Sequence, residues 1–136
     1  MKVAVIDPSA LLRGRILRLV SALPRADFVV ASGRESWLPN LIRLDPDLVI
    51  IEVRGAGGEG LRPTLARIRK LRRRLGRPSI VVLTNAVSGQ HRQCCLEAGA
   101  DFFLDKSLEF ERLLAILRRW RRRGTRHGPV RPAAHR

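Results

Sequence analysis

The strongest constraint on the fold is an uninterrupted apolar run, Leu48–Ile51, that ends at a carboxylate. Pro46 precedes the run, Glu52 follows it, and a turn with four glycines occupies residues 55–60. A short run rich in Val and Ile between such turn signals indicates a strand that is buried on both faces. Strands of this kind belong to parallel sheets covered by helices, whose functional sites lie at the carboxyl ends of the strands. Glu52 is therefore predicted to stand at such a site.

The rest of the sequence alternates between strand and helix signals. Further strands are predicted at 2–6, 27–32, 79–84 and 101–105. The predicted helices are one that Ser9 caps and Pro24 closes, then 36–44, 61–75 and 88–98, and a last one that Ser107 caps and that reaches Arg123. In the first helix, Leu11, Leu12, Ile16, Leu17 and Val20 form the apolar line. Five strands alternating with five helices predict an α/β fold of the flavodoxin-like, doubly wound (βα)5 kind, with a five-stranded parallel sheet in the order 2-1-3-4-5.

Polar residues stand at the ends of four of these strands. Because the carboxyl ends of parallel strands meet at one edge of the sheet, they are expected to share a cleft: Asp7, Glu52, Thr84 and Lys106. Two carboxylates, a hydroxyl and an ammonium are the groups that handle a phosphoryl group. One carboxylate accepts it, a divalent metal neutralises it, and the hydroxyl and ammonium hold its oxygens.

The order and spacing of these segments resemble the receiver domain of two-component response regulators. The segments are Val-Ile-Asp7, Pro46-Asp-Leu-Val-Ile-Ile-Glu52, Glu59-Gly60, Thr84-Asn-Ala86 and Glu97-Ala-Gly-Ala-Asp-Phe-Phe-Leu-Asp-Lys106. The resemblance runs from Lys2 to about Arg119 and implies a stand-alone, CheY-like phosphorelay regulator. In that family, a third-strand aspartate takes phosphate from a histidine kinase, and two acids after the first strand hold magnesium. The resemblance also implies that Thr84 and Lys106 bind the phosphoryl group and that Phe103 takes the aromatic switch position.

The sequence departs from this family where the chemistry is done. Glu52 replaces the phosphoacceptor aspartate, and Pro8 occupies the place of the second acid. Arg54 stands where the family offers a backbone carbonyl to the metal, and Ala56 and Ser107 replace two usual prolines. Magnesium requires near-ideal octahedral geometry and releases water reluctantly, so binding at Asp7 and Glu52 is expected to be weak or absent. No other cofactor is predicted.

These departures lead to the hypothesis of a pseudo-receiver that does not run the phosphorylation cycle. Arg54 is expected to replace the metal by pairing with Glu52 or Asp7. One interpretation has Glu52 contacting Lys106 and Thr84 and holding an active-like state permanently. The other has Glu52 in a structural salt bridge only. A receiver that can still be phosphorylated is a further alternative, and the residues leave all three open.

The charge of the chain is +15 and unevenly spread. Residues 1–117 hold nineteen basic and twelve acidic residues, whereas residues 118–136 add eight arginines and no acid. We expect a receiver-like domain over residues 1–123 and a disordered basic tail over 124–136. Five arginines at the end of the last helix form the predicted polyanion patch: Arg118, Arg119, Arg121, Arg122 and Arg123.

Two kinds of partner follow from the resemblance and the charge. The family commonly uses the face of its fourth helix, fifth strand and fifth helix, which predicts a protein partner such as a kinase, regulator or effector. The alternative is a nucleic-acid-binding regulator that uses the arginines of the third helix and the C-terminal region. A solvated helix end with a disordered tail explains the charge equally well.

Other chemistries find little support in the residues. The sequence lacks a P-loop, a dinucleotide fingerprint and a Ser/His/Asp arrangement, so no enzyme is predicted. His91, Cys94 and Cys95 share a helical spacing, but Cys95 is expected to face the core, which argues against a metal site there. No apolar stretch approaches the roughly 20 residues of a membrane span, and no export signal is visible. A cytoplasmic location without membrane contact is therefore predicted.

Overall fold

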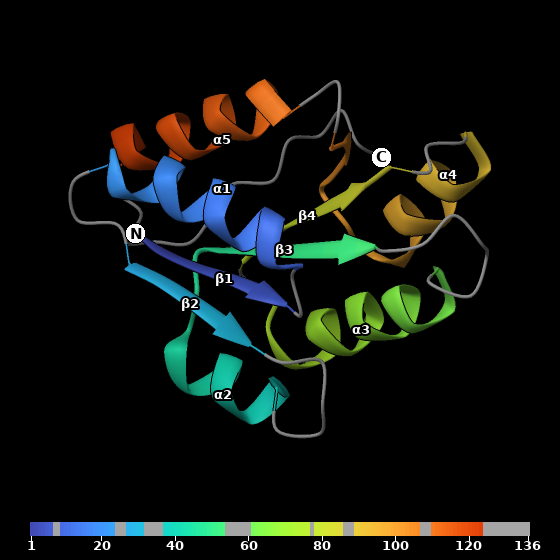
Figure 1. The fold of residues 1–136 in the computed structure, drawn as a ribbon. Coiled ribbons are helices and arrows are strands. Elements are labelled where there is room, and N and C mark those ends of the chain that lie inside the picture. The colour runs from blue at the N-terminus through green and yellow to red at the C-terminus, as the bar shows by residue number, and fades with distance from the viewer. Residues whose placement is uncertain are drawn as a thin grey trace.

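The computed structural model describes residues 1–6, 9–23, 27–31, 37–53, 61–76, 78–85, 89–106 and 110–123. These ranges form a five-stranded parallel sheet with helices on both faces (Figure 1). The strands are β1 (Lys2–Ile6), β2 (Asp27–Ala31), β3 (Leu48–Val53), β4 (Ser79–Thr84) and β5 (Phe102–Asp105). The helices are α1 (Ala10–Ser21), α2 (Trp37–Leu44), α3 (Leu61–Arg74), α4 (Gly89–Ala98) and α5 (Phe110–Arg123).

The strand order is β2-β1-β3-β4-β5, and every neighbouring pair is parallel. The predicted flavodoxin-like fold is thus confirmed. β3 and β4 are buried along their whole length, as the apolar run Leu48–Ile51 predicted for β3. β3 runs past the apolar run and includes Glu52, which faces Leu83 across the ladder. The predicted strand start at 101 differs by one residue from the observed limit, which is the usual uncertainty of such boundaries, and the predicted strand end at 32 lies outside the described residues.

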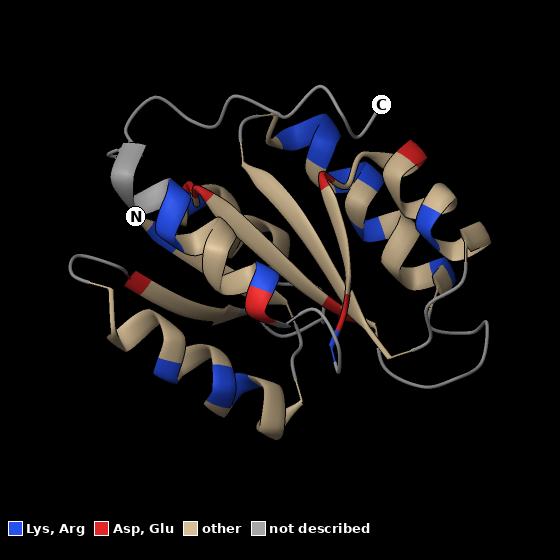
Figure 2. Cartoon of the chain, turned by 90° about the horizontal axis from the view of Figure 1, so that it is seen from above, with Lys and Arg blue, Asp and Glu red and all other residues tan. Residues whose placement is uncertain are grey.

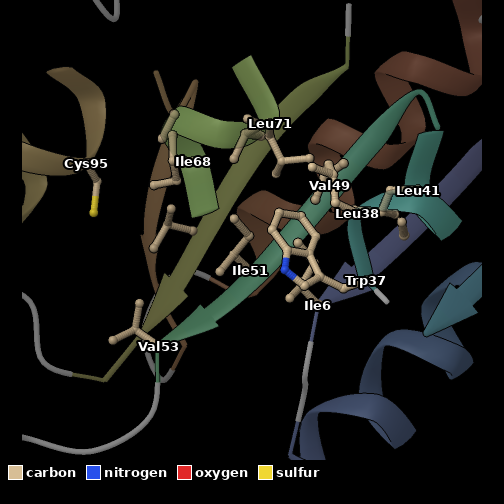
Figure 3. Close-up of a cluster of buried hydrophobic side chains, with 14 of the residues drawn as sticks. Ile6, Trp37, Leu38, Leu41, Val49, Ile51, Val53, Ile68, Leu71 and Cys95 are labelled. Carbon is tan, nitrogen blue, oxygen red and sulfur yellow. The ribbon is translucent and has the colours of Figure 1, made fainter. Parts of the chain in front are cut away.

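Two apolar cores flank the sheet, one for each layer of helices. α1 and α5 cover one face, and α2, α3 and α4 cover the other (Figure 1). On the second face, Trp37 of α2 and Leu71 of α3 pack with Ile51 of β3, while Cys95 approaches from α4 (Figure 3). Both faces of the sheet are therefore covered, and the functional groups are left to the strand ends.

The prediction for the apolar line of α1 was partly wrong. Leu12, Ile16 and Val20 are buried against the sheet, but Leu11 is 74% and Leu17 50% exposed. Residues four apart share a face of a helix, and the three buried residues occupy the single face that meets the sheet. The two other leucines point away from that face.

Arg72 of α3 forms hydrogen bonds at the amino-terminal edge of the sheet. Its guanidinium donates to the carbonyls of Gly99 and Pro78 at 2.8 and 2.7 Å. It also pairs with the Asp101 carboxylate, which in turn accepts the Ile80 N–H at 2.7 Å. Only a planar fork of N–H groups reaches three partners in this way. Arg72 therefore serves the fold.

The charges of the described residues are unevenly placed. Lys and Arg form bands on the helices, whereas most Asp and Glu lie at strand ends (Figure 2). The sequence of α3 contains seven basic residues and no acid. Within the ranges that the structure describes, no helix is both long and apolar enough to cross a membrane.

Candidate functional site: a buried glutamate at the carboxyl edge of the sheet

Glu52 lies next to the last residue of the central strand β3, at the carboxyl edge of the sheet. Its side chain is only 1% exposed. A carboxylate removed from water in this way requires hydrogen-bond donors that replace its hydration. Two residues distant in the sequence, Ser9 and Lys106, supply them.

Ser9 binds both oxygens of the Glu52 carboxylate. Its backbone N–H donates to Oε1, and its hydroxyl donates to Oε2 at 3.1 Å. The same hydroxyl accepts the N–H of Leu12 at 3.2 Å, so Ser9 is also the N-cap of α1, as predicted. The amino terminus of a helix attracts negative charge, which favours the carboxylate at this position.

Lys106 donates from its ammonium to Oε2 of Glu52 and forms an ion pair with it. The Lys106 side chain is 15% exposed, so little water competes for either charge. Its backbone N–H continues the sheet by donating to the Thr84 carbonyl at 2.9 Å. The hypothesised contact between Glu52 and Lys106 is therefore present.

Thr84 is the last residue of β4 and is buried at the same edge. The sheet register pairs it with Val53 on one side and Asp105 on the other. Among the described residues, however, the hydrogen-bond donors to the Glu52 carboxylate are Ser9 and Lys106. The hypothesised contact between Glu52 and Thr84 is thus not among the hydrogen bonds of the Glu52 carboxylate in the described region.

Phe103, at the predicted switch position, is buried in β5 on the face that α2, α3 and α4 cover. The Arg92 guanidinium of α4 lies 5.3 Å from the centre of the Phe103 ring. It also donates to the Phe103 carbonyl at 3.1 Å. This combination of a cation–π contact and a hydrogen bond ties α4 to β5 beside the site.

Several predicted site residues fall outside the described ranges. Asp7, Pro8 and Arg54 are among them, so the pairing of Arg54 with an acid and the missing metal ligand stay predictions. The Ser107 cap and the tail after Arg123 are outside as well. Arg118 and Arg119 lie exposed on α5, whereas the side chains of the three later arginines in that helix are not described.

The described residues fit a magnesium ion poorly. Both oxygens of Glu52 already accept hydrogen bonds, and a cation there would have to displace Ser9 or the Lys106 ammonium. No group of three or more His, Cys, Asp or Glu side chains that could hold a metal occurs in the described part of the chain. Weak or absent magnesium binding at Asp7 and Glu52 remains a prediction.

The two cysteines differ in environment, as the sequence predicted. Cys95 is fully buried in the core and Cys94 is partly exposed. Burial raises the pKa of the Cys95 thiol to about 11, and the neighbouring Cys94 adds to the increase. A proton-holding, buried thiol is an unsuitable metal ligand.

Sequence reasoning missed the role of Ser9 in binding Glu52. The signal was available, because a helix cap that follows β1 must lie at the same edge as the carboxyl end of β3. It also missed Arg92, for which the sequence offers no comparable signal.

Of the comparisons with known proteins, the one with solved structures agrees with this architecture. No protein-family model matches the sequence. No curated protein matches it either. Among solved structures, a pilus assembly-related protein from Burkholderia pseudomallei aligns with a TM-score of 0.69 and 22% identity over 97% of this chain and 94% of that one.

Two receiver proteins are similarly close. The signal receiver domain of a DNA-binding response regulator from Colwellia psychrerythraea aligns with a TM-score of 0.68 and 17% identity, over 88% of this chain and 96% of that one. The chemotaxis protein CheY4 from Vibrio cholerae aligns with a TM-score of 0.66 and 24% identity, over 87% and 96%. At these identities the likeness establishes the fold, which is the CheY-like fold of response regulator receiver domains.

Proposed function

We propose that this protein is a receiver-like regulatory module of two-component signalling that acts through protein–protein contact and without a phosphorylation cycle. The observation that carries the proposal is that both carboxylate oxygens of Glu52 already accept hydrogen bonds. Glu52 stands where a receiver has its phosphoacceptor. Ser9 and Lys106 together engage both carboxylate oxygens. The module has no catalytic turnover in this proposal.

The closed site argues against phosphoryl transfer. A nucleophilic oxygen must point along the line of attack on phosphorus, and a misplacement of about 1 Å can cost on the order of 100-fold in rate. Glu52 has one methylene more than aspartate, and its Oε2 accepts from both the Ser9 hydroxyl and the Lys106 ammonium. An incoming phosphodonor would have to break these bonds in a dry environment, where they are strongest.

The same contacts support a fixed signalling state. Lys106 is held by Glu52, and Phe103 is held inward by Arg92. Both residues belong to the end of the sheet that adjoins α4 and α5. We therefore favour a permanent, Glu52-dependent state over a switch, and we assign partner contact to the face formed by α4, β5 and α5.

This proposed face has polar groups that can meet a partner. Gln93 and Glu97 are exposed on α4 and hydrogen-bonded to each other at 2.9 Å. On α5, Arg112, Arg118 and Arg119 are exposed and cationic. A partner with an acidic rim fits such a surface, because charge complementarity speeds encounter and excludes wrong partners.

Exposure to acetyl phosphate and magnesium, followed by intact mass measurement, tests the proposal. The wild type is expected to gain no phosphoryl group. The Pro8→Asp/Glu52→Asp variant restores both acids and serves as the control for a competent site. A phosphoryl group on wild-type Glu52 that disappears in Glu52→Gln would overturn the proposal and leave a receiver that can still be phosphorylated.

Partner binding provides the second measurement. Affinity capture from the native cell should recover the same proteins with wild type whether or not acetyl phosphate is present. Capture that depends on acetyl phosphate would contradict a fixed state. Capture that survives Lys106→Met would contradict the role of the Glu52–Lys106 pair in maintaining that state.

A further inference from the structure

The exposed side of α3 carries a dense group of cations, which we call the cationic face: Arg62, Arg69, Lys70, Arg73 and Arg74. None of their side chains forms an ion pair or hydrogen bond with another residue in the described ranges. Arg62, Arg69 and Arg73 follow one another seven and four residues apart, which puts them on one side of the helix. At about 1.5 Å per residue the face extends over roughly 17 Å.

Fold stability does not account for the cationic face. Arg62 lies in the first turn of α3, where the helix dipole disfavours a positive charge. The turn holds no acid that would offset this cost. Arg72 provides the contrast, because it is the arginine of this helix that is largely buried and bonded to the sheet edge. The arginines of the cationic face are therefore available for a ligand.

The composition of the face distinguishes between kinds of ligand. Protein interfaces depend on a desolvated apolar or aromatic centre, and membrane-surface helices expose an apolar side. The leucines of α3, among them Leu65 and Leu71, pack in the core against the sheet instead. Single-stranded nucleic acid binds through stacking on aromatic side chains, and α3 has none. A charged, extended and apolar-free surface suits the phosphate backbone of a duplex.

We propose that the cationic face of α3 binds duplex nucleic acid through its phosphates, without reading the base sequence. This activity is separate from the proposed signalling function and uses the layer of helices opposite α1 and α5 (Figure 1). Guanidinium groups make paired hydrogen bonds to phosphate oxygens, and their binding releases counterions. The roughly 17 Å length corresponds to about five phosphates of one strand at about 3.4 Å each.

Fluorescence anisotropy with a labelled DNA duplex and the full chain tests this proposal. With five phosphate contacts, the affinity should fall on the order of 500-fold between about 50 and 200 mM salt. The Arg69→Gln/Arg73→Gln variant should bind more weakly at low salt and reduce the slope of log affinity against log salt by about 2. The matched control is Arg13→Gln/Arg18→Gln, which removes the same charge from exposed positions of α1. It should keep the wild-type slope.

The remaining outcomes overturn the proposal in distinct ways. If both double variants lowered the affinity for the duplex equally, binding would depend on net charge alone. Loss only when Arg126, Arg131 and Arg136 are replaced by Gln would assign binding to the C-terminal region. Binding to anionic phospholipid vesicles, but not to the duplex, would identify a membrane ligand. Because phosphorylation plays no part here, none of these results bears on the signalling function. Circular dichroism of each variant checks that it is folded.

Discussion

Glu52 and Lys106 place two opposite charges in a region with almost no water, and each charge depends on the other. Removing one partner of a buried pair leaves an uncompensated charge, which typically costs about 3–5 kcal/mol. Ser9 remains as a donor to Glu52, which places the expected loss for Lys106→Met at the lower end of that range. The energetic link between the two residues can be measured directly.

We expect Lys106→Met and Glu52→Gln each to lower the free energy of unfolding by about 3 kcal/mol. The double variant should be more stable than the sum of the two losses predicts, because neither charge is then left alone. Urea titration of the four proteins gives the coupling energy. Strictly additive losses would show that the two side chains do not act as a pair.

Cys94 and Cys95 are adjacent in sequence but should differ sharply in reactivity. Only a thiolate is alkylated, and the Cys95 pKa of about 11 leaves almost none at pH 8. Iodoacetamide should therefore label the native Cys94→Ser variant very slowly, and rapidly once guanidinium unfolds it. Mass spectrometry of the two conditions provides the measurement, and rapid labelling of the native variant would contradict burial of Cys95.

The same pKa predicts a pH dependence of stability. Folding raises the thiol pKa from 9.0 to about 11, so the folded state retains its proton where the unfolded state loses it. This contribution to stability is fully present below pH 9 and declines as the pH rises toward 11. Cys95→Ala should flatten that part of the stability profile relative to wild type, and an identical profile would exclude Cys95 as its source.

At the scale of the element, the amino terminus of α1 is joined to the end of β3 through Ser9. The Ser9 hydroxyl caps the helix and donates to Glu52 at the same time. In most helices, serine and aspartate are about equally good N-caps. At this helix they should not be equivalent, because the added carboxylate would lie against Glu52.

We expect Ser9→Asp to destabilise the protein more than Ser9→Ala. The alanine variant loses a cap worth about 1 kcal/mol, whereas the aspartate variant keeps the cap and adds repulsion between two poorly hydrated carboxylates. The order should reverse in the background of Glu52→Gln. Thermal unfolding of these variants tests the prediction, and an aspartate variant as stable as wild type would show that Ser9 lies away from Glu52.

α3 contains two adjacent arginines with opposite roles. Arg72 donates to the carbonyls of Gly99 and Pro78 and to Asp101, whereas Arg73 is exposed. Arg72→Gln should lower the free energy of unfolding by about 3 kcal/mol, because buried hydrogen-bond partners lose a charged donor. Arg73→Gln, the matched control, should change it by about 0.5 kcal/mol or less. Similar effects in the two variants, measured by urea titration, would contradict the assigned role of Arg72.

At the scale of the molecule, the strand order and the buried strands β3 and β4 were predictable. Continuous apolar runs and turn residues leave few arrangements of a five-stranded sheet. The meeting of Glu52 with Lys106 followed from that topology alone. The direction in which side chains point was harder to predict from the sequence. Leu11 and Leu17 fit a helical apolar line, but they lie beside the single face that meets the sheet. The positions of Arg72 and Arg92 depend on tertiary contacts that periodicity does not contain.

The net charge of +15 should itself weaken the folded state. Like charges repel more strongly in the compact molecule than in the unfolded chain, and salt screens this repulsion. The Debye length falls from about 30 Å at 0.01 M salt to about 8 Å at 0.15 M. The melting temperature should therefore rise over this range of sodium chloride. A constant or falling melting temperature would show that surface ion pairs outweigh the repulsion.

Gly99 has a φ of +125°, and a Cβ on this residue would lie 2.6 Å from Cγ of Arg72. Either property alone disfavours a side chain at this position. The two residues, 27 positions apart, are joined by a 2.8 Å hydrogen bond, so a substitution of one affects the environment of the other. In related sequences we expect this arginine and this glycine to be kept or lost together. Such a covarying pair would help to recognise homologues of this chain among the many distant proteins that share its fold.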